Sequence, residues 1–274
     1  MGNLPLYRGF ITAHMKAQME YRFGFFVQHI VLMLYYCISY LGLWIVLEKF
    51  QTIAGWTFYE VLLLFSLNLF AYSISSFFFG FGSMRNMDRL VQQGTFDSLL
   101  IFPLNPLVHL ALKHFSNSYV AHSILCIVIF VVCFEELDIK LGPLDVLLFC
   151  IVLIGGALIQ AAAMIATGTI SFWFVRSTSA VDGAMQYTAK FVDYPIVIYQ
   201  RWVQVVLTFV IPFAFISFYP AETFLGRDNT SVLHGILIFD PLFQFGTPLV
   251  GAVLFFLAYR FWKCGINHYQ STGT

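Results

Sequence analysis

Long apolar runs separated by short polar connectors dominate the chain. An α-helix needs about 20 apolar residues to cross the hydrocarbon core of a bilayer, and six runs approach or exceed that length. The runs are continuously apolar, whereas barrel strands alternate over about ten residues between turns. The pattern therefore predicts an all-α integral membrane protein, a single domain over residues 1–274, with spans at 24–47, 57–80, 107–134, 144–175, 196–219 and 245–262.

Composition agrees with the pattern of apolar runs. The 274 residues are 59% hydrophobic and only 10% charged, whereas a soluble domain carries about 25% charged residues. Mean hydropathy is +0.81. Because the formal net charge is zero, bulk electrostatics indicate no nucleic-acid partner. Membrane lipids are the expected surroundings.

The first 23 residues contain two competing patterns. Polar and apolar residues alternate from Thr12 to Arg22, yet helix formers are frequent and apolar residues near the start recur at helical spacing. We favour a helix that lies along the membrane surface. A frayed polar lead-in is the alternative. A signal peptide is not expected, because the first apolar run is too long and has no cleavage site behind it.

Basic residues predict the orientation of the chain. Of the 14 lysines and arginines, all but Lys49, Lys140 and Arg227 fall on one side if both termini lie on that side. The positive-inside rule makes that side cytoplasmic. The long connector 89–106 then faces the cytoplasm.

Polar side chains inside the spans are functional candidates, because an ionisable group in hydrocarbon is costly. Glu60 is expected near the outer interface, within reach of water, and Lys113 and His114 about two turns into the third span. Asn68 and Gln160 lie deeper. They are expected either to bond a neighbouring helix or to face a translocation path. No span carries the paired acids or arginine row of an ion-coupled pump or voltage sensor.

The fourth span contains the small-residue stretch GGALIQAAAMIATG at 155–168. Small faces let membrane helices approach closely. We therefore predict tight helix packing here, either within one chain or between two.

Motifs for catalysis and metal binding are missing from the sequence. It has no phosphate-binding GxxxxGK[ST], no HExxH and no GxSxG. Its five cysteines are scattered, with no metal-ligand spacing. We expect no catalytic residue, no metal and no cofactor in this chain.

The connector RLVQQGTFDSLLIFPLNP at 89–106 has more pattern than a loop needs. Gly94 can end a first short helix, and Thr95 or Asp97 can cap a second. Pro103 and Pro106 then restrict the backbone where the chain re-enters the membrane. The connector is predicted to be rigid and exposed.

Several segments carry a family resemblance. They are YRFGF at Tyr21–Phe25, GWTFYEVLLL at Gly55–Leu64, QGTFDSLLIFPLNPL at Gln93–Leu107, IPFAFISFYPAETFLG at Ile211–Gly226 and the tail Trp262–Gly273. Together they resemble the type 2 (ABC-2-like) transporter permeases, specifically six-span bacterial proteins. The likeness covers nearly the whole chain, and the Phe-Asp-x-x-Leu-x-x-Pro-Leu-x-Pro block is its most specific part.

The resemblance implies a membrane permease that a separate ABC ATPase drives. The connector would be a cytoplasmic coupling helix, and the contact would be carried by Arg89, Gly94, Phe96, Asp97, Leu100 and Pro103. Residues 176–199 would form a second cytoplasmic segment, and 211–240 would form short outer re-entrant helices. Two ATPase copies would bind ATP and Mg, and a second permease chain, identical or homologous, would complete the complex in the bacterial cytoplasmic membrane.

The expected activity is export of a lipid-like, peptide or hydrophobic natural-product substrate, with no hydrolysis by this chain. An ion-coupled secondary transporter or channel is the main alternative, and an intramembrane enzyme is the third. A secondary transporter is expected to show inverted repeats and broken helices at corresponding positions. No convincing repeat is present, although Pro212 interrupts the fifth apolar run.

Overall fold

The computed structural model describes residues 22–80, 83–113, 115–174, 178–227 and 246–270, with the single residues 9, 12 and 16. Within these residues the regular structure is helical, and one isolated bridge joins Ile53 to Trp56. The all-α prediction is confirmed. The interfacial helix predicted before residue 22 lies outside the described residues except at those single positions.

Five described helices are long and apolar enough to cross a membrane, and a bent pair gives up to six spans. Four of the five match predicted spans closely, because runs of about 20 apolar residues form helices of membrane length. The five helices are α2 (Arg22–Phe50), α3 (Phe58–Phe79), α7 (Ser118–Glu136), α8 (Pro143–Thr169) and α13 (Thr247–His268).

The predicted third span, 107–134, is wrong at its start. The chain forms a short helix α6 (Pro106–Lys113), breaks, and begins α7 at Ser118. At the break the Ser116 amide donates to the Phe77 carbonyl at 2.9 Å. Serine and asparagine favour helix ends over helix interiors because their side chains compete for backbone groups. The mean hydropathy of the run does not reveal this break.

The predicted fifth span, 196–219, is not one continuous helix. Two short helical segments replace it, and they bend by 103° at Pro212. Proline cannot donate to the helix ladder, which accounts for the bend. The segments are α10 (Arg201–Val205) with the π-helix η5 (Val206–Val210), and α11 (Ala214–Leu225).

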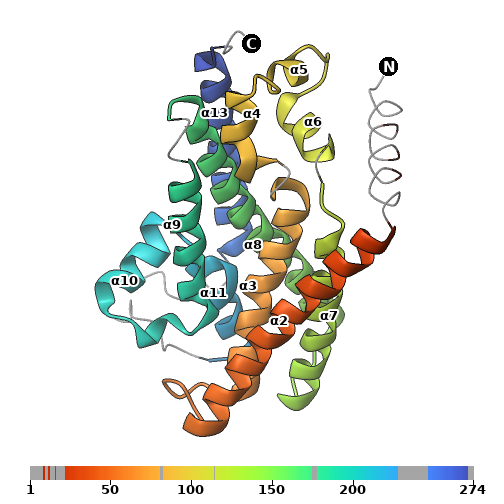
Figure 1. The fold of residues 1–274 in the computed structure, drawn as a ribbon. Coiled ribbons are helices and arrows are strands. Elements are labelled where there is room, and N and C mark those ends of the chain that lie inside the picture. The colour runs from red at the N-terminus through yellow and green to blue at the C-terminus, as the bar shows by residue number, and fades with distance from the viewer. Residues whose placement is uncertain are drawn as a thin grey trace.

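The segment predicted as a second cytoplasmic connector, 176–199, is helical over most of its described residues. Helix α9 (Thr178–Lys190) packs against α8, the turn η3 (Phe191–Asp193) packs against α3, and Val192 and Ile196 are buried in the main core. The Ser217 hydroxyl of α11 donates to the Val192 carbonyl at 2.8 Å. The end of this segment therefore packs into the bundle, whereas α9 lies along its side with Tyr187 77% exposed (Figure 1).

Helix α3 lies at the centre of the bundle, with α2, α7, α8 and α11 around it (Figure 1). Residues Val61 to Leu69 are all buried. In contrast, α2 leaves a long apolar face exposed, including Ile30, Leu34 and Ile38. An apolar face of this kind suits contact with hydrocarbon.

The small residues of α8 pack against α13 of the same chain, which resolves the alternative left by the sequence. A Cβ placed on Gly155 would lie 2.8 Å from the Pro248 Cα. Glycine is needed here because the two backbones approach too closely for any side chain. The predicted close packing is confirmed.

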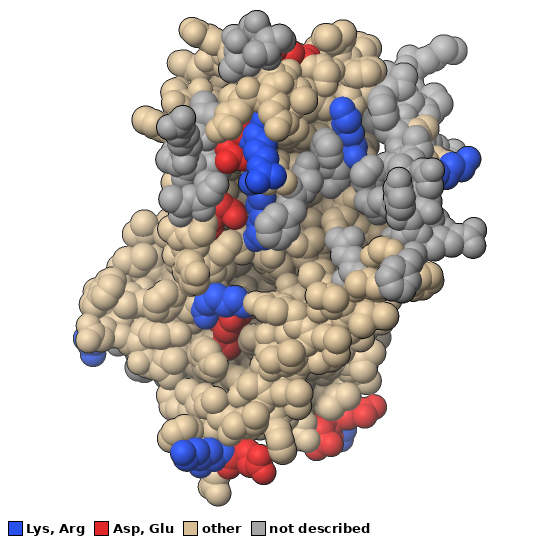
Figure 2. Space-filling view, in the orientation of Figure 1, with Lys and Arg blue, Asp and Glu red and all other residues tan. Residues whose placement is uncertain are grey.

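On the face drawn in Figure 2, most charged side chains lie in the upper part and at the lower end, and the band between them carries few. Inside that band a basic and an acidic side chain lie together. Charges in such a band are expected to be paired or functional. Their partners are described below.

Candidate functional site: the connector, the polar cavity and the outer ion pair

The connector after α3 folds into two short helices, α4 (Met87–Gln92) and α5 (Asp97–Leu100). Gly94 has φ +65°, a left-handed conformation that glycine adopts without strain. The Phe96 amide donates to the Leu90 carbonyl at 3.1 Å and closes the turn. The predicted break at Gly94 is confirmed.

The predicted caps of α5 are wrong. The helix starts at Asp97, so this residue lies in the first turn rather than before it. The Thr95 hydroxyl instead donates to the Leu90 carbonyl at 3.2 Å. Its bond closes the turn between α4 and α5, because a threonine hydroxyl readily bonds nearby backbone.

Phe96 fixes the connector to the rest of the chain. It is fully buried, and its ring centroid lies 5.2 Å from that of Phe172, 6.0 Å from Trp262 and 5.0 Å from Tyr269. Edge-on contacts at these distances are favourable aromatic geometry. Burial, and then the neighbouring Asp97 carboxylate, raise the pKa of Tyr269 to about 12. The cluster joins the connector to η2 (Ile170–Phe172) and to the end of α13.

The outer side of the connector is exposed and partly apolar. Ile101 is 82% exposed, and Leu100 and Phe102 are also exposed. Among the predicted coupling residues, Arg89, Leu100 and Pro103 are exposed, Gly94 and Asp97 are half-buried, and Phe96 is buried. We call residues 100–103 the exposed edge.

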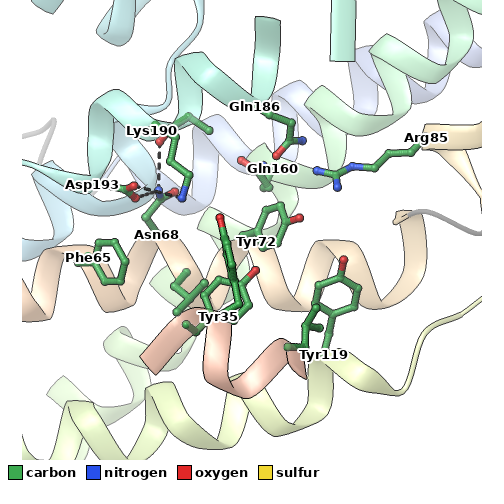
Figure 3. A pocket seen from close by; sticks show the side chains of 14 residues that line it. Tyr35, Phe65, Asn68, Tyr72, Arg85, Tyr119, Gln160, Gln186, Lys190 and Asp193 are labelled. Carbon is green, nitrogen blue, oxygen red and sulfur yellow. Dashed lines mark hydrogen bonds and ion pairs between the residues drawn. The ribbon is translucent and has the colours of Figure 1, made fainter. Parts of the chain in front are cut away.

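The two predicted path residues, Asn68 and Gln160, line one cavity of about 410 Å³ (Figure 3). They come from α3 and α8, which are distant in sequence but packed together. Other lining side chains come from α2, α7, α9 and the residues around η1 (Met84–Asn86); the polar and aromatic ones include Tyr35, Tyr72, Arg85, Tyr119, Gln186, Lys190 and Asp193. The cavity therefore combines aromatic and charged groups inside the bundle.

Asp193 forms a polar cluster with its neighbours at one side of the cavity. The Asn68 amide donates to Asp193 Oδ1 at 2.7 Å and to the Ala189 carbonyl at 3.1 Å. Lys190 Nζ lies 3.4 Å from Asp193 Oδ2. A buried carboxylate needs such partners, because an isolated charge in an apolar interior is very costly.

Arg85 lies at the other side of the cavity (Figure 3). Its side chain is 6% exposed, its Nε lies 3.5 Å from Asp182 Oδ2, and its guanidinium lies 5.4 Å from the Tyr72 ring centroid. The sequence placed Arg85 and Lys190 among the inner surface charges and missed both as cavity residues. No local signal could reveal this polar cluster, because Asn68 bonds Ala189 and Asp193, which lie more than 120 positions further along the chain.

The predicted candidates Lys113 and His114 are not among the residues that line the cavity. Lys113 ends α6 instead of lying inside a span, because the helix breaks there. His114 lies outside the described residues. His122 is buried, with its ring centroid 4.2 Å from that of Tyr36. It packs behind Tyr36, which lines the cavity.

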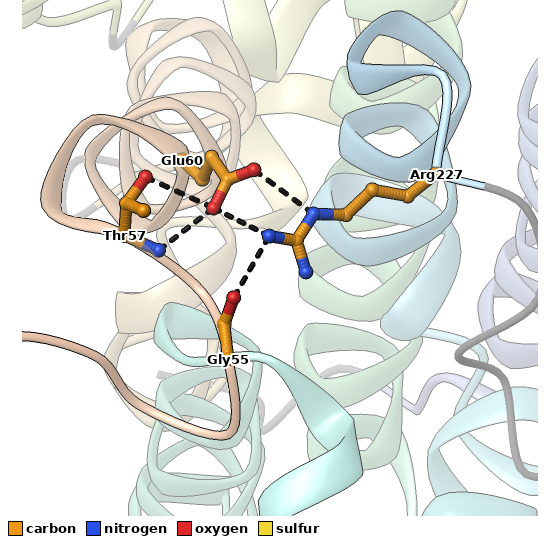
Figure 4. A network of polar contacts seen from close by, with 4 residues as sticks. All are labelled: Gly55, Thr57, Glu60 and Arg227. Carbon is orange, nitrogen blue, oxygen red and sulfur yellow. Dashed lines mark hydrogen bonds and ion pairs between the residues drawn. The ribbon is translucent and has the colours of Figure 1, made fainter.

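Glu60 is buried and ion-paired, not exposed to water as the sequence suggested. Arg227, just after α11, donates from Nε to Glu60 Oε1 at 2.9 Å and from Nη2 to Oε2 at 2.7 Å (Figure 4). The guanidinium also lies 4.8 Å from the Trp56 ring centroid. A two-point contact of this kind is strong and directional. It joins the start of α3 to the end of α11.

Among the described residues, no group of three or more histidine, cysteine, aspartate or glutamate side chains is placed to hold a metal ion. What the chain offers is a bundle of membrane-length helices, an internal polar cavity and an exposed connector. These features are those of a multi-pass helical membrane protein.

The chain belongs to the ABC-2 family of transporters. The sequence model described as "ABC-2 family transporter protein" matches residues 33–273, most of the chain. It is thus a permease component without an ATPase domain, and a component of this kind works with an ATPase partner. Searches of curated proteins and of solved structures gave no match.

Proposed function

We propose that this chain is the permease half of an ABC exporter in the bacterial cytoplasmic membrane. A second permease chain, identical or homologous, and two copies of an ATPase complete the complex. Both termini and the connector face the cytoplasm, in keeping with the distribution of basic residues. ATP and Mg are bound by the partner ATPase. The cargo is a lipid-like molecule, a peptide or a hydrophobic natural product.

The exposed edge is the observation that carries this proposal. Leu100, Ile101 and Phe102 present apolar side chains on a connector held by a buried aromatic cluster. Apolar groups surrounded by polar ones are typical of a surface that binds another protein. Because Phe96 anchors the connector to Trp262, a push on the edge moves α13 instead of being absorbed by a loose loop.

The cavity supports the transport role. Asn68 and Gln160 are candidates for the translocation path because they line a polar cavity in the bundle and do not serve only to bond a neighbouring helix. The broken fifth crossing supplies an element that can rearrange, since a proline bend interrupts its hydrogen-bond ladder.

The test is ATPase activity of the purified complex, obtained by tagging this chain and recovering its partner. Ile101→Asp places a charge on the exposed edge and is expected to lower vanadate-sensitive ATP hydrolysis or release the partner. Leu144→Asp is the matched control, because Leu144 is 78% exposed at the start of α8, one helix length from η2 and the connector. Equal losses in both variants would contradict the proposed docking.

Transport under an ion gradient by the chain alone, with no ATPase recovered, would favour the secondary transporter. That result would contradict the permease proposal directly. The polar groups Asp193 and Lys190 would then be the first residues to examine, because intramembrane charges mark ion pathways.

A further inference from the structure

The polar cavity has two unlike walls (Figure 3). One wall carries charged and amide groups from α8, α9 and η3, including Gln160, Lys190 and Asp193. The facing wall is apolar and aromatic, with Leu32 and Tyr35 from α2. A space of about 410 Å³ with a polar and an apolar side suits an amphipathic ligand.

The lining itself carries one positive charge in excess. The lining contains two cations, Arg85 and Lys190, and one carboxylate, Asp193. That carboxylate already accepts from Asn68 and lies 3.4 Å from Lys190. The partner of Arg85, Asp182, is not part of the lining. Guanidinium and ammonium groups are the usual protein ligands of phosphate and carboxylate groups.

Gln160 calls for a hydrogen-bond donor on the ligand. The residue is 2% exposed, and its amide oxygen has no hydrogen-bond partner among the described residues. A buried polar atom without a partner is unfavourable. The terminal amide torsion is broad, so the oxygen can turn toward a ligand in the cavity. A hydroxyl or amine on the ligand would satisfy it.

The cavity reaches the surface of the chain beside α2. Two of its lining residues are more than half exposed, Tyr35 at 56% and Lys190 at 57% of its side chain. Next to Tyr35, Val31 and Leu34 form an exposed apolar face. A hydrocarbon chain attached to a head in the cavity can therefore lie along α2.

We propose that the cavity binds the head of an amphipathic anion that also carries a hydrogen-bond donor, while its hydrocarbon chain lies along α2. An acidic lipid or a lipid-like molecule with hydroxyl groups has this chemistry. The inference rests on the proposed function, because it names the substrate class of the permease.

The test uses the full chain purified in detergent with whatever ATPase accompanies it. Short-chain phosphatidylglycerol, which has a phosphate and hydroxyl donors, is compared with phosphatidylcholine of the same chain length, which has no donor. Equilibrium binding is expected to favour phosphatidylglycerol by about tenfold. Equal binding of the two lipids would overturn the inference.

Two variants locate the site. Gln160→Leu removes an amide whose oxygen has no partner among the described residues, so folding should be preserved while the preference for phosphatidylglycerol is lost. Arg85→Gln is expected to weaken phosphatidylglycerol more than phosphatidylcholine. Arg260→Gln, an exposed arginine on α13, is the matched control and should leave the preference intact. A preference that survives Gln160→Leu would contradict the assignment.

Two further results separate this inference from the permease proposal. Glycerol 3-phosphate, the head without hydrocarbon, should bind far more weakly, and equal binding would rule out an amphipathic ligand. If the ATPase is recovered but neither lipid is preferred, the inference fails and the permease proposal stands. If phosphatidylglycerol is preferred but no ATPase is recovered, the binding site stands and the permease proposal fails.

Discussion

Different interactions hold the helices together at the two ends of the molecule. At the connector end, Phe96 packs with Phe172, Trp262 and Tyr269 in a buried aromatic cluster. At the opposite end, Glu60 and Arg227 form a two-point ion pair. Aromatic packing depends on shape and burial, whereas an ion pair depends on two charges that can be changed one at a time. We call the aromatic cluster around Phe96 the fixed joint and the ion pair between Glu60 and Arg227 the releasable joint.

The largest expected effect is at the fixed joint. Phe96→Ala should lower the free energy of unfolding by about 3–5 kcal/mol, because it leaves a cavity in a buried cluster. Thermal unfolding in detergent measures the loss. Phe102→Ala is the matched control, since Phe102 is 42% exposed on the same connector and should cost far less. Similar losses for the two variants would contradict the fixed joint.

The releasable joint should show a smaller effect that depends on both charges. Glu60→Gln and Arg227→Gln are each expected to destabilise the chain, and the double variant should lose less than the sum. A double-mutant cycle should give a coupling energy of about 1–2 kcal/mol. Purely additive losses would show that the contact between these side chains contributes no stability.

The smallest effect is expected at the residue that orients the glutamate. The Thr57 hydroxyl donates to Glu60 Oε2 at 2.9 Å, and the Thr57 amide donates to the same oxygen at 2.7 Å. Thr57→Val keeps the amide bond and the shape but loses the hydroxyl, so it should cost about 1 kcal/mol. If Thr57→Val destabilised the chain as much as Arg227→Gln, the ion pair would not be the main tie at this end.

Hydropathy predicted the architecture where a helix is apolar along its whole length, as in α3 and α8. It failed where local polar groups or proline act inside an apolar run, as at Ser116 in the third span and Pro212 in the fifth. A window that averages hydropathy over about 20 residues cannot detect a single break.

The site was predictable only in part. Asn68 and Gln160 stood out as polar residues deep in apolar runs, and the structure places them on one cavity. Their charged neighbours did not stand out, because Arg85 and Asp193 lie in sequence stretches that read as surface connectors. Phe96 carried a motif but no sign that it would be buried. Such long-range contacts leave no periodic trace in a single sequence.

The central claim is that the exposed edge, held by Phe96, docks on a partner ATPase. Site-specific photo-crosslinking tests it most directly, with the crosslinker at Ile101, which is 82% exposed, and at Leu144, which is 78% exposed at the start of α8, one helix length from the connector. We predict a crosslink to the ATPase subunit from position 101 and none from position 144. A crosslink from neither position, or from position 144 alone, would contradict the account.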